Sequence, residues 1–145
     1  MATAQDAELV LKLYELRTEP VLRKARHFMT AEFNPKTLDE FFVVMRGAGT
    51  EQNAYWRQVT SYWDMAASLV LRGALDADLF LDSNVECLFL LARVDHLREE
   101  YRTATGMPLM RNVAALIEKY PEAAARYEGM VKGMRARAAA AKTGE

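Results

Sequence analysis

An aromatic pair, Tyr55 and Trp56, is repeated seven residues later as Tyr62 and Trp63. Seven residues make almost two turns of an α-helix, so both pairs project toward nearly the same side of one helix. Apolar residues extend this side at three- and four-residue steps, namely Val59, Ala66, Leu69 and Val70. The pattern predicts the central helix of a packed helical bundle, with both tryptophans sheltered in the core.

The length and composition fit a single globular domain. A chain of 145 residues buries roughly 70% of its unfolded surface, so it needs no disulfide or metal for stability. Hydrophobic residues make up 51% and charged residues 27%, a balance that excludes extended disorder. Seven glycines and four prolines are too few for the many tight turns of a sheet-rich fold. We therefore expect an all-α, single-domain helical bundle of about five to seven helices over residues 1–145, with a C-terminal tail that frays from about residue 140.

Capping and breaking residues divide the chain into helices. Residues 5–32 form a first helical region, which Pro20 either kinks or splits in two, with Thr18 able to cap a second helix. Of these alternatives we favour the kink. A long central helix is expected after the cap residue Thr50, and another over residues 83–104. The remaining helices are expected near residues 37–46, 77–81, 108–120 and 121–142.

The sequence predicts a cytoplasmic protein with no membrane segment. The N-terminal residues lack the basic and apolar regions of a secretory signal, and the longest apolar stretches fall far short of the ~20 residues that a spanning helix needs. The lone Cys87 excludes an intrachain disulfide and suits a reducing compartment. A net charge of −1 gives no global field for nucleic acid, and acidic residues interrupt the basic clusters, so we expect no nucleic-acid partner.

No arrangement of residues in the sequence predicts catalysis, a metal or a cofactor. Only two histidines are present, and the pair formed by His96 and Glu99 supplies two ligands where a metal site needs more. Cys87 lies on an apolar helix stripe, where a thiol usually acts as a small hydrophobic group. There is no nucleophile elbow and no glycine loop for phosphate. We therefore expect no catalytic residue, cofactor or metal.

Asp64 lies on a polar stripe of the central helix. We expect it to be solvated or to pair structurally rather than to act as a functional carboxylate. If it is buried, it needs a cationic or hydrogen-bond donor partner, such as an arginine of the first helix.

Two groups of residues are candidates for binding. An aromatic cluster could form the core or, alternatively, wall a pocket for a small apolar ligand; its members are Phe41, Tyr55, Trp56, Tyr62 and Trp63. The last helix carries Tyr127, Met130 and Met134, which could fill the core or present a surface to a partner, most simply a second copy of the chain.

Four stretches of the sequence together resemble an uncharacterised bacterial family of small helical proteins. They are residues 13–17 (Leu-Tyr-Glu-Leu-Arg), 23–26 (Arg-Lys-Ala-Arg), 59–66 and 73–80. Some members of that family carry an N-terminal membrane segment, which this sequence lacks. The resemblance implies a single helical domain, and it implies no activity and no site residues.

We therefore expect a non-enzymatic protein-interaction or scaffolding bundle that self-associates as a homodimer. The alternative is a small-ligand-binding bundle with an aromatic-lined pocket near Trp56 and Trp63. An enzyme would require a cleft in which Asp64, Glu99 or His96 converges with an arginine.

Overall fold

The computed structural model describes residues 1–144, and within that range it contains nine α-helices and no strand. This confirms the all-α, single-domain prediction, although the helices exceed the five to seven expected. In chain order they are α1 (Ala4–Arg17), α2 (Pro20–His27), α3 (Leu38–Met45), α4 (Glu51–Leu71), α5 (Ala77–Ser83), α6 (Glu86–Arg93), α7 (Arg98–Thr105), α8 (Arg111–Lys119) and α9 (Pro121–Thr143). A π-helical turn, Phe28–Glu32, follows α2, and a 3-10 turn, Asp95–Leu97, joins α6 to α7.

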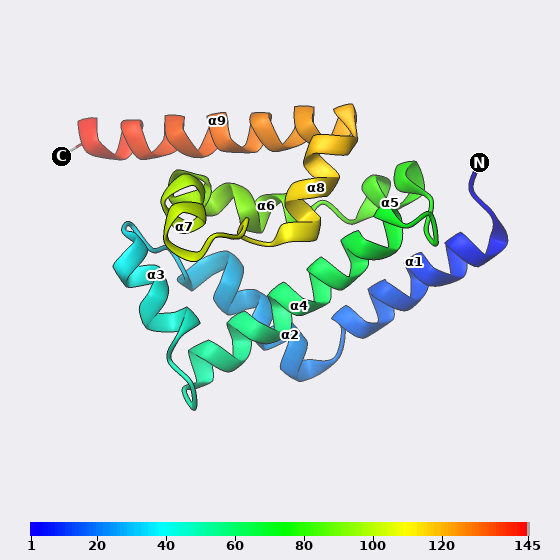
Figure 1. Cartoon of the computed structure of the whole chain (residues 1–145), viewed down its shortest axis with the longest axis horizontal. Coiled ribbons are helices and arrows are strands. Elements are labelled where there is room, and N and C mark those ends of the chain that lie inside the picture. Colours follow the sequence, from blue (N-terminus) through cyan, green and yellow to red (C-terminus); the bar gives the residue numbers. More distant parts are fainter. Residues whose placement is uncertain (145) are drawn as a thin grey trace.

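Helix α4 is the centre of the bundle, as the aromatic repeat predicts. It packs against α2, α3 and α8, while α9 covers α6 and α8 (Figure 1). In Figure 1 the helices α1 to α4 lie below, the helices α6 to α8 lie above them, and α9 runs along the upper edge. The inner side of α4 is buried along its length, through Asn53, Val59, Tyr62, Trp63, Ala66, Ala67 and Val70. No helix within residues 1–144 is long and apolar enough to cross a bilayer.

The first helical region is two helices, so the favoured kink is wrong. Thr18 ends α1, and its backbone amide donates to the Glu15 carbonyl at 3.1 Å. Glu19, rather than Thr18, caps α2: its carboxylate accepts from the Leu22 amide at 2.8 Å. Pro20 then occupies the first turn of α2, where its missing N–H leaves no hydrogen bond unmade. A proline at this position starts a helix more readily than it bends one.

The single helix expected over residues 83–104 is also wrong. The chain leaves helical geometry at Val94, where φ is −116° and ψ is 18°, and resumes as α7 after the 3-10 turn. The break redirects the chain so that Tyr101 packs against Phe41 of α3, with ring centroids 5.8 Å apart. Val94 and Leu97 at the break are themselves buried. Burial of side chains against several neighbours therefore outweighs continuous helical periodicity here.

Helix α9 continues without interruption to Thr143. The fraying expected from about residue 140 concerns motion and stays a prediction. Residue 145 lies outside the described residues.

Candidate functional site

The two tryptophans of the repeat occupy different environments. Trp63 is fully buried, and its indole Nε1 donates to a Glu86 carboxylate oxygen at 2.9 Å. The hydroxyl of the adjacent Tyr62 donates to the Leu13 carbonyl of α1 at 2.5 Å. Burial raises the pKa of that hydroxyl to about 12. Trp56, by contrast, is only partly buried. The expectation that both rings are sheltered therefore holds fully for Trp63 alone.

The Glu86 carboxylate accepts the hydrogen bonds of a polar cluster beside Trp63. Arg26 of α2 donates to it twice, from Nε at 2.8 Å and from Nη2 at 2.9 Å. This bidentate hydrogen bonding raises the pKa of Arg26 further above its ordinary value. The Arg17 guanidinium carbon lies 5.5 Å from the centre of the Trp63 ring. The cluster joins α1, α2, α4 and α6, and its pairing indicates a structural role.

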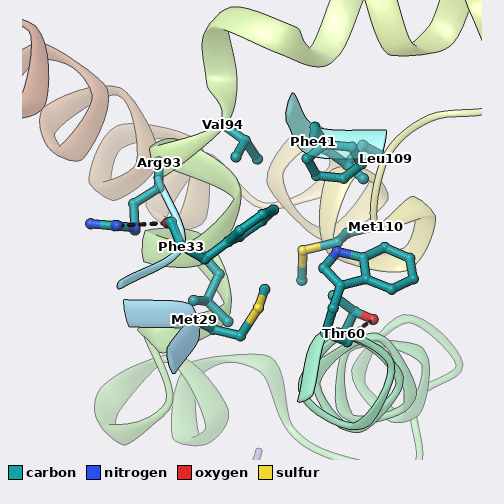
Figure 2. A pocket seen from close by; sticks show the side chains of 10 residues that line it. Met29, Phe33, Phe41, Thr60, Arg93, Val94, Leu109 and Met110 are labelled. Atoms are coloured by element: carbon teal, nitrogen blue, oxygen red, sulfur yellow. Dashed lines mark hydrogen bonds between the residues drawn. The ribbon is translucent and has the colours of Figure 1, made fainter. Parts of the chain in front are cut away.

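A small internal cavity lies beside Trp56. Its volume is about 10 Å³, close to the minimum for one water molecule. Figure 2 shows Met29, Phe33 and Met110 converging on this space, while the Arg93 guanidinium points away from it and donates to the Phe33 carbonyl at 2.7 Å. Phe41 meets the Trp56 ring edge-on, with centroids 6.1 Å apart. We call this space the inner cavity; as it stands, it is too small for an organic ligand.

A larger, open groove adjoins the inner cavity. It has a volume of about 340 Å³ and lies between α4 and the connection from α7 to α8. Trp56, Thr60, Leu109 and Met110 line both spaces. We call it the α4–α8 groove; its remaining lining residues are Arg57, Ser61, Asp64, Tyr101 and Arg111.

Met110, which lines both the inner cavity and the groove, has a strained backbone conformation. Its φ of 47° and ψ of 65° are left-handed, and it is the sole non-glycine residue with positive φ within residues 1–144. A long side chain in this region costs about 1–2 kcal/mol, so the surrounding structure must impose the conformation. The preceding Leu109 is buried and anchors the connection on one side. The start of α8 anchors it on the other.

Asp64 holds the start of α8. Its Oδ1 accepts from the backbone amides of Asn112 at 2.8 Å and Val113 at 3.2 Å. Its Oδ2 accepts from the Asn112 side-chain amide at 2.9 Å. Helix α8 has no cap from its own N-terminal residue. Asp64 is therefore a structural carboxylate, as expected, but its partner is a helix N-terminus rather than an arginine of the first helix.

The structure brings together two of the five predicted pocket residues. Phe41 and Trp56 line the inner cavity. Trp63 binds Glu86, Tyr62 binds the Leu13 carbonyl, and Tyr55 lies against Phe28 with ring centroids 5.7 Å apart. No sequence pattern identifies the groove residues Tyr101 of α7 and Arg111 of α8. Arg57 and Tyr101 are 44 positions apart in the sequence, and no local pattern connects them.

The predicted partner surface on α9 faces inward for the most part. Tyr127 is buried, and Met130 and Met134 are partly buried against the core. The Tyr127 hydroxyl donates to Asp95 and accepts from Arg98 Nη1 at 3.0 Å, and burial raises its pKa. A partner role for these three residues stays a prediction.

Two hollows bring a carboxylate together with arginines, as an enzyme would require, and one of them is the groove, where Asp64 lies with Arg57 and Arg111. Cys87 is fully buried, and burial raises the pKa of its thiol to about 12, so it is protonated at neutral pH. His96 lies with its Nε2 3.0 Å from the Pro35 carbonyl oxygen. Glu99 shares a separate surface hollow with Arg98 and Arg102, and neither this hollow nor the groove is lined by histidine or cysteine. Within residues 1–144, no three metal-binding side chains converge.

The fold and the site define the class of protein: a small all-α bundle with a partly buried polar cluster beside Trp63 of α4 and an open groove lined by Trp56 to Asp64 of the same helix. The chain belongs to the family described as a domain of unknown function (DUF4760), whose model matches residues 2–120. Helix α9 lies beyond the matched residues. Comparisons with curated proteins and with solved structures found no match.

Proposed function

We propose that this chain is a non-enzymatic protein-interaction or scaffolding bundle that self-associates through the outer face of α1. The observation that carries the proposal is a helix whose apolar residues extend beyond the face that packs on the core. The inner face contributes the buried Leu13 and the partly buried Leu9 and Val10 to the core. The outer face presents Leu11 and Tyr14, which are 68% and 62% exposed.

These outer residues form a continuous stripe. Ala7, Leu11 and Tyr14 follow one another at four- and three-residue steps, so they lie on one side of α1. Leu16 and Val21 add exposed apolar surface where α1 meets α2. An apolar stripe that stays exposed beside the core-packed face of a helix is a candidate contact surface for another protein. A second copy of α1 can cover it, because a two-fold axis places the same stripe against itself.

Sedimentation velocity and native mass spectrometry test this proposal. We expect the wild type to be dimeric at high micromolar concentration and the double variant Leu11→Glu/Tyr14→Glu to be monomeric, because paired carboxylates repel in an apolar interface. The matched control is Val43→Glu on α3, since Val43 is 74% exposed but lies away from the stripe. A wild type that stays monomeric at high micromolar concentration contradicts self-association. A double variant that remains dimeric contradicts the α1 interface and leaves self-association standing.

A second candidate function is small-ligand binding beside Trp56. The α4–α8 groove favours it, because its volume falls within the ~300–1,000 Å³ of ligand pockets and it is continuous with the aromatic wall of the inner cavity. Trp56 fluorescence reports on this site directly in a Trp63→Phe variant, which leaves one tryptophan. Emission that is insensitive to a broad set of small molecules argues against this candidate.

A further inference from the structure

The α4–α8 groove has two cationic side chains on facing walls. Arg57 projects from α4 and Arg111 from the first position of α8, and both line the groove. Both side chains are exposed, and within residues 1–144 neither guanidinium has an ion pair or a side-chain hydrogen bond. Guanidinium groups bind carboxylates through two parallel N–H donors. The groove therefore presents free donors for an anion.

One carboxylate also lines the groove and limits the charge of that anion. Asp64 carries one negative charge against the two positive charges of the arginines, so the lining side chains have a net charge of +1. The oxygens of Asp64 already accept from Asn112 and Val113, so they are turned toward α8. A monoanion balances this lining, whereas a dianionic phosphate would exceed it and lie near a fixed negative charge.

The rest of the lining is suited to a flat apolar body. Trp56 lines the groove from α4 and Tyr101 from α7, and Leu109 and Met110 line it from the connection to α8. Such pockets combine apolar walls with a few polar groups that orient the ligand. Aromatic rings pack against Trp and Tyr faces at modest additional gain over burial alone.

We propose that the α4–α8 groove binds small aromatic carboxylates, with the carboxylate held by Arg57 and Arg111 and the ring packed against Trp56 and Tyr101. This inference rests on the ligand-binding candidate described above and is independent of self-association through α1. The ligand lies in the groove itself, because the adjoining inner cavity has room for one water molecule at most.

The test uses three probe carboxylates, benzoate, 2-naphthoate and indole-3-acetate, titrated into the wild-type protein by isothermal titration calorimetry. Tryptophan emission of the Trp63→Phe variant reports in parallel on Trp56 with benzoate. We expect 2-naphthoate to bind at least about tenfold more tightly than the neutral 2-naphthalenemethanol, because only the anion pairs with the guanidiniums. We also expect its binding to weaken as salt is raised. Acetate and inorganic phosphate, each alone, are expected to bind more weakly than 2-naphthoate.

The double variant Arg57→Gln/Arg111→Gln is expected to bind 2-naphthoate no more tightly than the neutral alcohol. Its matched control is Arg72→Gln, which removes an exposed arginine at the far end of α4 and leaves binding unchanged. Circular dichroism and thermal unfolding show whether each variant folds like the wild type.

Three results overturn the inference: no binding of any probe carboxylate, equal affinity for the acid and the alcohol, or tighter binding of phosphate than of 2-naphthoate. If the alcohol binds at Trp56 as tightly as the acid, the ligand-binding candidate stands and the proposed ligand charge is wrong. Dimerisation is measured separately by sedimentation, so failure of this inference leaves the α1 proposal unaffected.

Discussion

Asp64 and Asn112 are 48 positions apart in the sequence, yet the Asp64 carboxylate accepts both the backbone and the side-chain amide of Asn112. The contact places a negative charge at the N-terminus of α8, where unpaired backbone donors and the helix dipole favour it. It also fixes one end of the connection that walls the groove. A residue of the central helix thus performs the role that a neighbouring cap residue usually has.

Replacing Asp64 by alanine is expected to lower the free energy of unfolding by about 1–2 kcal/mol, the usual cost of losing a helix cap. Urea denaturation followed by circular dichroism measures the change. The control is Asp82→Ala, because Asp82 is exposed and has no hydrogen bond or ion pair among the described residues; we expect a change within about 0.5 kcal/mol. Equal effects of the two substitutions would show that Asp64 does not stabilise α8.

Among the charged residues, Glu86 is the one whose substitution is expected to lower the free energy of unfolding most. Its side chain is 16% exposed and that of its partner Arg26 is 25% exposed, so Glu86→Ala leaves a half-buried guanidinium and the Trp63 indole without their acceptor. Breaking such a pair costs about 3 kcal/mol. Chemical denaturation of the variant measures this loss.

The control for Glu86 is Glu51→Ala, which breaks the exposed ion pair between Glu51 and Lys24. Exposed pairs contribute little to stability, so this variant is expected to unfold close to wild type. If Glu86→Ala proves as mild as Glu51→Ala, the cluster beside Trp63 does not hold the four helices together.

Alkaline pH is expected to destabilise the protein through Cys87. Burial raises the pKa of its thiol from 9.0 to about 12 in the folded state. The native state therefore holds this proton more tightly than the unfolded state. The contribution of the protonated thiol to the free energy of unfolding is fully present below pH 9.0 and is lost as the pH rises toward 12. Ionisation of the unfolded thiol lowers the free energy of unfolding by about 1.4 kcal/mol per pH unit between these values.

The measurement is urea denaturation of wild type and Cys87→Ala from neutral pH to pH 11. The Cys87→Ala curve is expected to fall less steeply above pH 9, because the unfolded variant has no thiol to ionise. The raised pKa of Tyr62 makes both curves fall at higher pH. Parallel curves over this range would contradict a buried, protonated thiol.

The left-handed backbone conformation of Met110 predicts an unusual order of stability for its glycine and alanine variants. Both Met110→Gly and Met110→Ala lose the side chain, but glycine adopts positive φ without the steric cost that alanine incurs. We expect Met110→Gly to be more stable than Met110→Ala by about 1 kcal/mol. At Glu118, an exposed position within α8, the order should reverse, because alanine is the better helix former. Differential scanning calorimetry of the four variants measures both orders; an alanine advantage at both positions refutes the strain at Met110.

Local periodicity accounts for what the sequence predicts well. The spacing of the two aromatic pairs identifies α4, and Thr50 is identified as its cap residue; the Thr50 side chain accepts from the Asn53 amide. These features depend on residues within one or two helical turns of each other, so the sequence carries them explicitly. The break at Val94 is harder to predict, because it depends on how the following helix packs, whereas at Pro20 the local cap by Glu19 decides between a break and a kink.

The sequence by itself determined an all-α fold, a central helix with aromatic residues on one side, and the burial of Trp63. Only the tertiary structure decided that Trp63 meets Glu86 while Trp56, on nearly the same side of α4, borders an open groove. It also decided that Asp64 caps a helix 48 positions away. The physical reason is that helix periodicity fixes which residues share a side, whereas the hydrogen-bond partners and the hollows depend on which distant helix lies against that side.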